Sequence, residues 1–394
     1  MQILRNCRVV PELTPGFDGD RADIVLEGEK IVEVLPPKTA KGTDNVLDMS
    51  EMTVVPGLID AHVHLDLCGM DVFEENVQPA SYRTIRALKL AQDNLRHGYT
   101  TVRDLGDRDN IVLHMAKAVK EGMVVGPDIL ASGKILTPTE SGNEYFGDMY
   151  LEADSPAEFR KAVRLQNQLG ADWIKVMATG AIMNPGGVPG SPIIMEDELK
   201  AICDTAAFVG KPVAVHCHGA EGVKMAICCG VRTIEHSSIM DDECIRMYLE
   251  SENSYPIPTI FPPFDFAAHT EGKPAHYVEK ANNIKKSLVE SMRAAYQAGV
   301  KLGWGTDAGV SPDSHGNGIE EFRLRVHELD FTPKDCLIQA TKNNAEILMI
   351  DDEVGTIEVG KKANLVAFRG NPDEDVEVLN DIAVVIKSGA VVHL

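Results

Sequence analysis

The 394-residue chain has few basic residues for its size and contains no long apolar run. Its 38 lysines and arginines are outnumbered by 60 aspartates and glutamates, so the formal net charge is −22 at pH 7. A chain with this excess of negative charge is a poor partner for nucleic acid or for an anionic membrane. Because no stretch of about 18 apolar residues occurs, the sequence also offers no candidate for a transmembrane helix.

A secretion signal and CxxC pairs of cysteines are also missing. The first residues, MQILRNCRVVPEL, lack the apolar run of a signal peptide, and the 8 cysteines are scattered with no CxxC pair. A long chain without a secretion signal is expected to keep its thiols reduced, and without CxxC pairs no structural zinc knuckle is expected. We therefore expect a cytoplasmic protein without disulfide bonds.

Both ends of the chain are predicted to form short strands. Apolar runs separated by turn residues occupy residues 1–54, and similar runs follow in residues 351–394. Neither end carries enough strands for an independent sheet with a good core. We therefore expect the two ends to form one small β-sandwich domain together, beside a central domain of residues 55–350.

The central region alternates short apolar runs with longer segments that suit crossover helices, which is typical of a parallel α/β fold. The eight runs lie near residues 55–64, 99–104, 128–136, 172–177, 212–216, 231–235, 254–259 and 300–305. Eight strands with helices between them predict a closed (β/α)8 barrel of the TIM type. A doubly wound open sheet is the alternative, but no GxGxxG turn follows the first run.

Histidines stand at the ends of several of these runs, which is where such barrels carry their chemistry. The first run ends in Asp60-Ala61-His62-Val63-His64, and residues two apart on a strand point to the same face. The fifth run ends with His216, and the sixth with His236. A single HxH pattern is often structural, but neutral imidazole is also a common zinc ligand. Their repetition at strand ends predicts a metal site.

Two further runs carry an ionisable residue that suits such a site. Lys175 lies inside the apolar fourth run, where its charge must be paired, be carried to the surface by the stem, or be removed. Reaction of the amine with CO2 would convert it into a carbamate anion that can bridge two metals. Asp307 ends the eighth run and can contact a metal and accept a proton from metal-bound water.

With these positions the sequence resembles the amidohydrolase superfamily almost from end to end. The matching stretches are PGLIDAHVH (56–64), TTVRDLG (100–106), IKVMATG (174–180), VHCHGAEG (215–222), TIEHSS (233–238), GTDAG (305–309) and IEVGKKANLV (357–366). Within the superfamily it is most similar to the prolidase and Xaa-Arg dipeptidase branch, which is related to imidazolonepropionases.

The resemblance implies a centre of two divalent ions, most favourably zinc, although manganese, iron and cobalt also suit the ligands. The buried ion would be bound by His62, His64 and Asp307, and the second ion by His216 and His236. Lys175, as a carbamate derived from CO2, would bridge the two ions. Deaminases and imidazolonepropionases of this superfamily usually hold one metal and lack the lysine, so Lys175 favours the two-metal form.

The resemblance also implies the reaction, which is hydrolysis of an amide bond in a small molecule. A metal-bridging hydroxide would attack, with Asp307 acting first as general base and then as general acid. The expected substrate is a dipeptide, Xaa-Pro or similar, or an N-acyl amino acid, and the family favours homo-oligomers. Alternatives are the opening of a cyclic amide, hydrolysis of a carbamate or ester, and a non-enzymatic scaffold. The intact ligand set argues against the scaffold.

Three residues are candidates for binding the substrate. His218 lies two residues beyond His216 and could donate to a substrate carbonyl or carboxylate, or be bonded locally in a loop. Tyr255 lies just inside the seventh run. Related dipeptidases often carry Gly-Gly-His-Gly after the third strand, whereas residues 137–144 lack that histidine. Glu140 lies there instead and favours a cationic group on the substrate.

Overall fold

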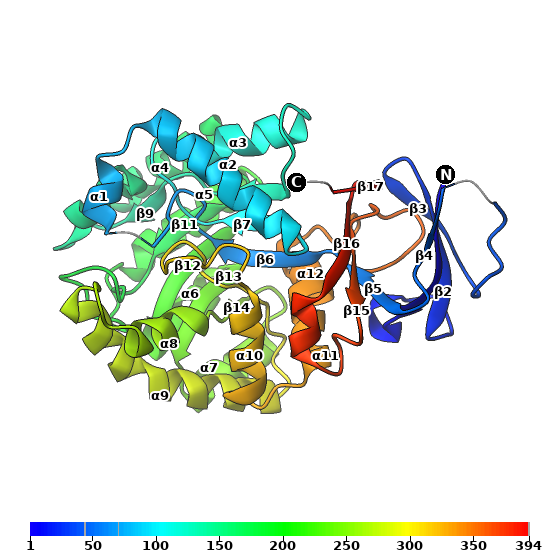
Figure 1. The fold of residues 1–394 in the computed structure, drawn as a ribbon. Coiled ribbons are helices and arrows are strands. Elements are labelled where there is room, and N and C mark those ends of the chain that lie inside the picture. Colours follow the sequence, from blue (N-terminus) through cyan, green and yellow to red (C-terminus); the bar gives the residue numbers. More distant parts are fainter. Residues whose placement is uncertain (43–44, 70, 393–394) are drawn as a thin grey trace.

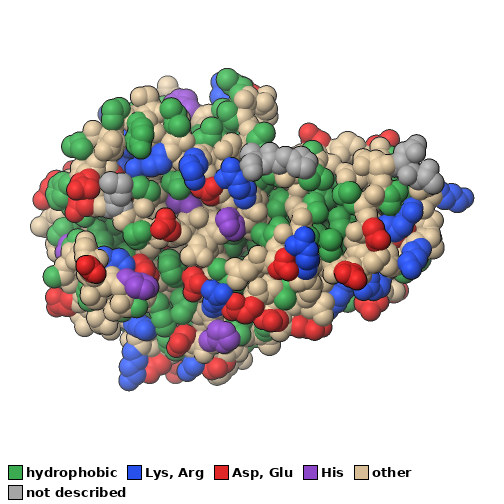
Figure 2. Space-filling view, viewed as in Figure 1, with side chains coloured by type: hydrophobic (Ala, Val, Ile, Leu, Met, Phe, Trp, Pro, Cys, Tyr) green, Lys and Arg blue, Asp and Glu red, His purple; other side chains and the backbone are tan. Residues whose placement is uncertain are grey.

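The computed structural model describes residues 1–42, 45–69 and 71–392. A large part of strands and helices lies beside a smaller sheet, to which both ends of the chain contribute (Figure 1). None of the helices in the described ranges has the length and apolar composition needed to cross a membrane. On the face seen in Figure 2, acidic and basic side chains are scattered among uncharged and apolar ones.

The smaller sheet joins strands from the two ends of the chain. Its N-terminal strands are β1 (Gln2–Val9), β2 (Arg21–Glu27), β3 (Lys30–Leu35), β4 (Val46–Asp48) and β5 (Met52–Pro56). Its C-terminal strands are β15 (Leu365–Arg369), β16 (Ile382–Lys387) and β17 (Ala390–Val391). The strand order is β17-β16-β15-β5-β1-β2-β3, with β4 beside β1, and the antiparallel pair β5–β15 links the two ends. The sandwich arrangement and the domain boundaries at residues 54 and 351 stay predictions.

An apolar cluster stabilises this sheet. Leu4, Ile24, Val54, Leu365 and Ile386 come from five different strands and are all buried in it. Successive side chains of a strand point to opposite faces, so the apolar residues of each strand can gather on one face of the sheet. The C-terminal residues are therefore part of the core that the N-terminal strands need.

The larger part is built on parallel strands, as predicted. One sheet has the order β6-β7-β8, and the other β10-β9-β11-β12-β13-β14. The strands are β6 (Leu58–Val63), β7 (Tyr99–Asp104), β8 (Asp128–Ala131), β9 (Ile135–Thr137), β10 (Tyr150–Glu152), β11 (Ile174–Met177), β12 (Val213–Gly219), β13 (Thr233–Ile239) and β14 (Tyr255–Ile257). Seven of the eight predicted runs contain a strand, and all pairings within the two sheets are parallel.

The eighth predicted run, 300–305, does not form a regular strand, although it lies where the eighth strand was expected. The backbone N–H of Gly303 donates to Pro256 O at 3.0 Å, and Trp304 O accepts from the N–H of Ala61 at 3.1 Å. The Asn344 amide donates to the same Trp304 carbonyl at 2.7 Å and thus competes with a regular strand ladder. The run therefore lies between β14 and β6 and links the two parallel sheets.

The helices that follow the parallel strands pack on the outside of the sheets (Figure 1). They are α2 (Ala80–Arg96), α3 (Ile111–Lys120), α4 (Pro156–Leu169), α5 (Glu196–Phe208), α6 (Ala220–Cys229) and α7 (Asp242–Glu250). In α4 the sequence sets both ends: Ser155 caps the N-terminus with Pro156 behind it, and Gly170 ends the helix at φ 92°.

Further helical segments occur between or after the strands. They include α1 (Val72–Asn76), η2 (Asn143–Met149), α8 (Phe261–Ala268) and α9 (Ala275–Gln297), and α9 packs on β13. The remaining ones are η1 (Pro11–Leu13), α10 (Ile319–His327), α11 (Pro333–Ile338), η3 (Gln339–Asn343), α12 (Asn344–Leu348) and η4 (Val376–Asn380).

Candidate metal centre

A cavity of about 660 Å³ opens at the carboxyl ends of the parallel strands. Its polar lining contains all six side chains predicted to bind metal, together with His218. These residues are His62, His64, Lys175, His216, His218, His236 and Asp307. They come from β6 and the residue directly after it, from β11, β12 and β13, and from the segment that follows residue 305. Residues far apart in the sequence thus meet at one end of the sheets.

Backbone conformation helps to direct two of these side chains. His236 has φ 72° and Asp307 has φ 56°, both in the left-handed region that residues other than glycine seldom adopt. Such backbone strain is concentrated at functional sites, where the surrounding structure holds it in place. Around Asp307, the N–H of Asp307 donates to His62 O at 2.8 Å and that of His64 donates to Ala308 O at 2.8 Å.

The first group of potential ligands is formed by His62, His64 and Asp307. Nδ1 of His64 lies 3.1 Å from Gly106 O, which can only accept, so Nδ1 carries the proton of the neutral ring. Nδ1 of His62 lies 3.0 Å from a carboxylate oxygen of Glu235, an acceptor that favours the tautomer with the proton on Nδ1. In both rings Nε2 is then left as an unprotonated acceptor.

These two Nε2 atoms both face the same carboxylate oxygen. Each lies 3.4 Å from Asp307 Oδ1, which is buried and has no hydrogen-bond donor among the described residues. Three acceptors that converge without a proton repel one another unless a cation lies between them. The arrangement therefore fits a divalent metal ion, and no other observation supports a metal site as directly.

A second group of potential ligands lies next to the first. The nitrogens of His216, His218 and His236 lie within 4.8 Å of one another, and His236 also forms such a group with His62 and Asp307. Nε2 of His216 lies 3.4 Å from Gly180 O, which leaves its Nδ1 free for a ligand. The two groups thus offer places for two neighbouring ions.

Burial favours the ligand form of these histidines. It lowers the pKa of His64 and of His218 to about 4, and it lowers the pKa of His216 and His236 well below the ordinary value. Transfer into the protein interior penalises the charged imidazolium, so the rings are neutral at pH 7. Neutral imidazole is the form that binds metal.

Lys175 is almost fully buried beside the histidines. Burial lowers the pKa of its amine to about 8, because the distant carboxylates of Glu235 and Asp307 compensate only in part. Among the described residues no hydrogen bond or ion pair holds this amine. A buried amine without a partner is costly, so the residue suits a modification that removes its positive charge.

Sequence reasoning missed the residue that supports His62. Glu235 lies on β13 directly before His236, and its carboxylate contacts His62 on one side and the guanidinium of Arg103 at 2.9 Å on the other. Arg103 also donates to Ala61 O at 2.7 Å and stacks on the ring of Trp173, so its role is structural. A glutamate inside an apolar strand was the available signal for Glu235.

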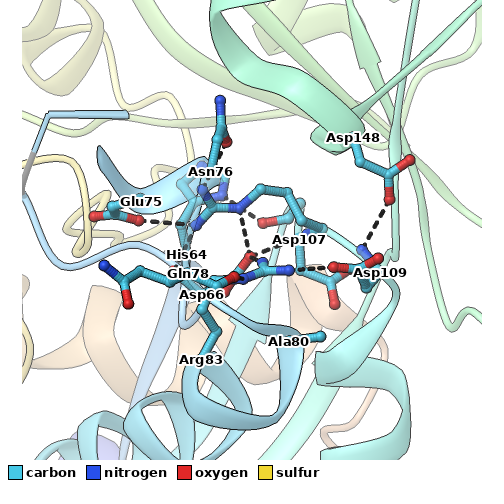
Figure 3. A network of polar contacts seen from close by, with 12 residues as sticks. His64, Asp66, Glu75, Asn76, Gln78, Ala80, Arg83, Asp107, Asp109 and Asp148 are labelled. Carbon is cyan, nitrogen blue, oxygen red and sulfur yellow. Dashed lines mark hydrogen bonds and ion pairs between the residues drawn. The ribbon is translucent and has the colours of Figure 1, made fainter. Parts of the chain in front are cut away.

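A polar network lies directly behind His64 (Figure 3). Asp66 accepts from Arg108 Nε at 2.7 Å and from Arg83 at 2.5 Å, and Arg108 also donates to Glu75 at 2.8 Å and to Asn76 at 2.9 Å. The two arginines and the two carboxylates are all buried. The network links α1 and α2 to the turn after β6, which starts at His64.

The three predicted substrate contacts differ in their placement. His218 lines the cavity, and its Nδ1 lies 2.9 Å from the hydroxyl of Ser238, which orients the ring. The structure does not bring Tyr255 to the cavity: it begins β14, at the end far from the site, and its hydroxyl donates to Glu252 O at 2.9 Å. Only the carboxyl end of a strand faces the cavity. Beyond the carboxyl end of β14, Thr259 is the residue that lines the cavity.

Glu140 also lies outside the lining of the cavity. It belongs to the loop between β9 and η2, where partial burial raises the pKa of its carboxyl group and the positive charge of Lys280 counteracts the shift. The segment 178–193 does contribute to the lining, through Ala181, Ile182 and Met183.

The chain is similar to known proteins over most of its length. The chain is 30% identical to a Xaa-Pro dipeptidase solved with methionine bound in the active site, over 100% of both chains, with a TM-score of 0.91. It is 30% identical to a prolidase solved with N-methylphosphonate-L-proline, over 99% of both chains, with a TM-score of 0.90. Ochratoxinase from Aspergillus niger is 28% identical over 96% of this chain and 80% of its own length.

The family follows from a match that covers most of the sequence. The model of the amidohydrolase family matches residues 53–392, which include every candidate ligand and the C-terminal strands. Members of this family generally bind divalent metals, and the histidine groups described above fit that property. The chain belongs to the amidohydrolase family.

Proposed function

We propose that the protein hydrolyses the amide bond of a small molecule at a centre of two divalent ions. The convergence of His62 Nε2, His64 Nε2 and Asp307 Oδ1, three acceptors without a proton between them, carries this proposal. His62, His64 and Asp307 would hold the more buried ion, and His216 and His236 the second. Zinc is the preferred ion for such a set of nitrogen and oxygen ligands, and manganese, iron and cobalt also suit it.

Lys175 is proposed to carry a carbamate that bridges the two sites. Its buried amine lies in the lining of the cavity together with ligands of both groups. Reaction of the neutral amine with CO2 forms an N–C bond and releases one proton, which leaves an anion with two oxygen donors. The carbamate removes the unpaired positive charge that Lys175 would otherwise carry in the interior. The positive charge of the two bound ions would stabilise the carbamate.

The bound ions would supply an activated water and polarise the scissile carbonyl. Asp307 contributes the only carboxylate among the described residues that line the cavity. It is therefore the group that takes a proton from the attacking water and returns it to the leaving amine. His218, fixed by Ser238, would donate from Nε2 to an oxygen of the substrate.

The proposed substrate is a dipeptide, Xaa-Pro or similar, or an N-acyl amino acid. Two of the similar solved structures are a Xaa-Pro dipeptidase and a prolidase. This similarity supports a substrate whose scissile amide lies next to an amino acid.

A hydrolysis screen tests the proposed function. Protein loaded with zinc or manganese is incubated with libraries of Xaa-Xaa dipeptides and N-acyl amino acids, and free amino acid is measured. The Asp307→Asn variant is the matched control for hydrolysis by a contaminating enzyme. Turnover that disappears in the variant supports the proposal. Protein with two bound metals and no turnover of either library contradicts it and leaves cyclic amides, carbamates and esters.

We also propose a closed (β/α)8 barrel with a separate domain formed by both termini. Hydrogen bonds from the run at 300–305 to both β6 and β14 support closure on one side. On the other side, the N–H of Asp172 donates to Ala131 O at 2.8 Å, which connects β8 to the start of β11. Residues 1–54 and 351–394 would form the second domain, supported by their shared sheet and apolar cluster.

A further inference from the structure

Beyond the metal ligands, the walls of the cavity are almost entirely apolar. The apolar lining residues come from the turn after β6, from β9, η2 and β10, from β11 and the segment after it, and from α8 and the loop after Asp307. They include Phe146, Met149, Tyr150, Ile182, Met183 and Phe266.

The side chains of these walls pack against one another and against residues behind them. The ring of Phe146 stacks on Tyr150 with centroids 4.7 Å apart, and Phe266 packs on Tyr277 at 5.2 Å. Phe146, Met149, Ile182 and Phe266 are buried. A large apolar surface with fixed side chains therefore faces the place where the groups flanking a scissile amide must lie.

The walls offer no charge to pair with a charged end of a substrate. Among the described lining residues, the only charged groups are Lys175 and Asp307, and both belong to the metal centre. Burial raises the pKa of the Tyr150 hydroxyl, so this side chain stays neutral. A free carboxylate or ammonium placed against these walls would lose its hydration without gaining a partner.

Cations near the rim are already engaged. Lys273 pairs with Asp265 at 2.6 Å, and the amine of Lys280 donates to the carbonyl oxygens of Asn184 and Gly187. Nε2 of His276 lies 3.1 Å from Met183 O. Lys280 and His276 thus hold the segment at residues 183–187, and none of these three groups is among the residues that line the cavity.

We propose that one of the two groups joined by the scissile amide is large, apolar and uncharged, and that these walls bind it. This inference rests on the proposed function and narrows its substrate class. Aromatic or long aliphatic N-acyl amino acids, or aryl amides of amino acids, are then better substrates than free dipeptides, whose ammonium and carboxylate both need partners.

Two matched substrate series test this inference. In the first, L-leucine carries a naphthoyl, acetyl, succinyl or alanyl group, so that only the acyl half varies. In the second, N-acetyl-leucine is linked to naphthylamine, methylamine or glycine, so that only the amine half varies. In at least one series, kcat/KM of the naphthyl compound should exceed that of every charged member by about 10²-fold, because burial of a naphthyl group is worth several kcal/mol.

A charge added to the wall tests the same point in the protein. Met183 is half-buried in the lining, so a lysine there can keep its stem in the wall and extend its amine into the cavity. Met183→Lys should lower kcat/KM for the naphthyl compound by about 10-fold. The ratio of this kcat/KM to that of the anionic compound in the same series should also fall. Met123→Lys adds the same charge at an exposed methionine outside the lining and should change neither value.

The outcomes separate this inference from the proposed function. Equal kcat/KM across both series, or a preference for charged members, overturns the apolar class and leaves amide hydrolysis intact. If no compound is hydrolysed, binding of the same compounds to the metal-loaded protein is measured by calorimetry. Selective binding of the naphthyl compounds then supports the apolar site while it removes the proposed reaction, and binding without selectivity overturns the inference.

Discussion

At the scale of single residues, Asp307 is proposed to serve both as a metal ligand and as the acid–base group. Oδ1 faces the Nε2 atoms of His62 and His64, and the side chain also lines the cavity where a substrate would lie. We expect Asp307→Asn to keep metal, because the amide oxygen can still act as a ligand, but to lower kcat by about 10²–10⁴-fold, the loss typical of a general acid–base group. Metal content and kcat are measured on the same sample. A kcat near that of the native protein would contradict the acid–base role.

Lys175 allows a second test at this scale. Lys175→Ala removes the group proposed to bridge both ions, so the purified variant should bind less than one metal per chain. Added acetate or propionate should restore part of the metal content and of the activity, since a small carboxylate can occupy the bridging position. Lys200→Ala, an exposed lysine on α5, is the control. Unchanged metal content in Lys175→Ala would remove the bridge from the site.

Glu235 lies one contact away from the proposed metal ion, behind its ligand His62. Its carboxylate lies 3.0 Å from Nδ1 of His62 and is itself paired with Arg103, and these contacts orient the ring with Nε2 toward Asp307. In Glu235→Gln we expect metal affinity to fall by about 10–100-fold, the usual effect of losing such support. Competition with a chromogenic chelator measures the affinity. A fall in kcat at saturating metal, with unchanged affinity, would instead indicate a direct catalytic role.

The sequence predicted the residues at strand ends better than their supports. The positions of His62, His64, His216 and His236 follow from the rule that parallel strands present their carboxyl ends to one site. Glu235 and Gly106 contact these histidines across strands, and no local pattern encodes such a pairing. Tyr255 was predicted from the strand it belongs to, but the structure has it at the opposite end of β14.

At the scale of elements, the network behind His64 connects helices to the metal site. Arg108 bonds to Asp66, Glu75 and Asn76, so α1 and the turn after β6 are held by one buried guanidinium. Arg108→Met should lower the free energy of unfolding by about 3–5 kcal/mol, because it leaves buried carboxylates with fewer partners. Urea denaturation measures this change.

The matched control for Arg108 is an exposed ion pair. Lys200→Met removes the partner of Asp204 on the surface of α5 and should change the free energy of unfolding by less than about 1 kcal/mol. Equal effects of the two substitutions would show that the buried network does not stabilise the fold more than a surface pair does.

Elements with regular patterns were predicted, whereas irregular ones were not. Runs of apolar residues predicted seven parallel strands, and the cap residues Ser155 and Pro156 mark the start of α4 as observed. The run at 300–305 departs from a regular strand because tertiary contacts crowd its glycines. A Cβ atom at Gly303 would lie 2.2 Å from Ile257, and one at Gly305 would lie 2.8 Å from His62. Such close approach depends on the other strands.

At the scale of the whole molecule, His315 ties the loop after Asp307 to the strand that carries His62 and His64. Its Nε2 lies 3.2 Å from His64 O and 3.1 Å from Leu67 O, and its Nδ1 lies 3.3 Å from the Asn94 amide nitrogen. The ring therefore donates from Nε2 and accepts at Nδ1. A second proton would point at the amide donor, so the contacts stabilise the neutral form.

These contacts predict how stability depends on pH. Burial lowers the pKa of His315 to about 4 from an ordinary value of 6.5, so the unfolded chain takes up a proton first as the pH falls. Stability is therefore complete above pH 6.5 and decreases between pH 6.5 and about 4, by about 1.4 kcal/mol per pH unit for this one group.

Urea unfolding of metal-free protein across this range gives the slope. His315→Gln, which keeps a donor but cannot titrate, should reduce the slope by up to one proton, whereas His114→Gln on the exposed face of α3 should not. Identical slopes in the two variants would mean that His315 binds the same number of protons in the folded and in the unfolded chain.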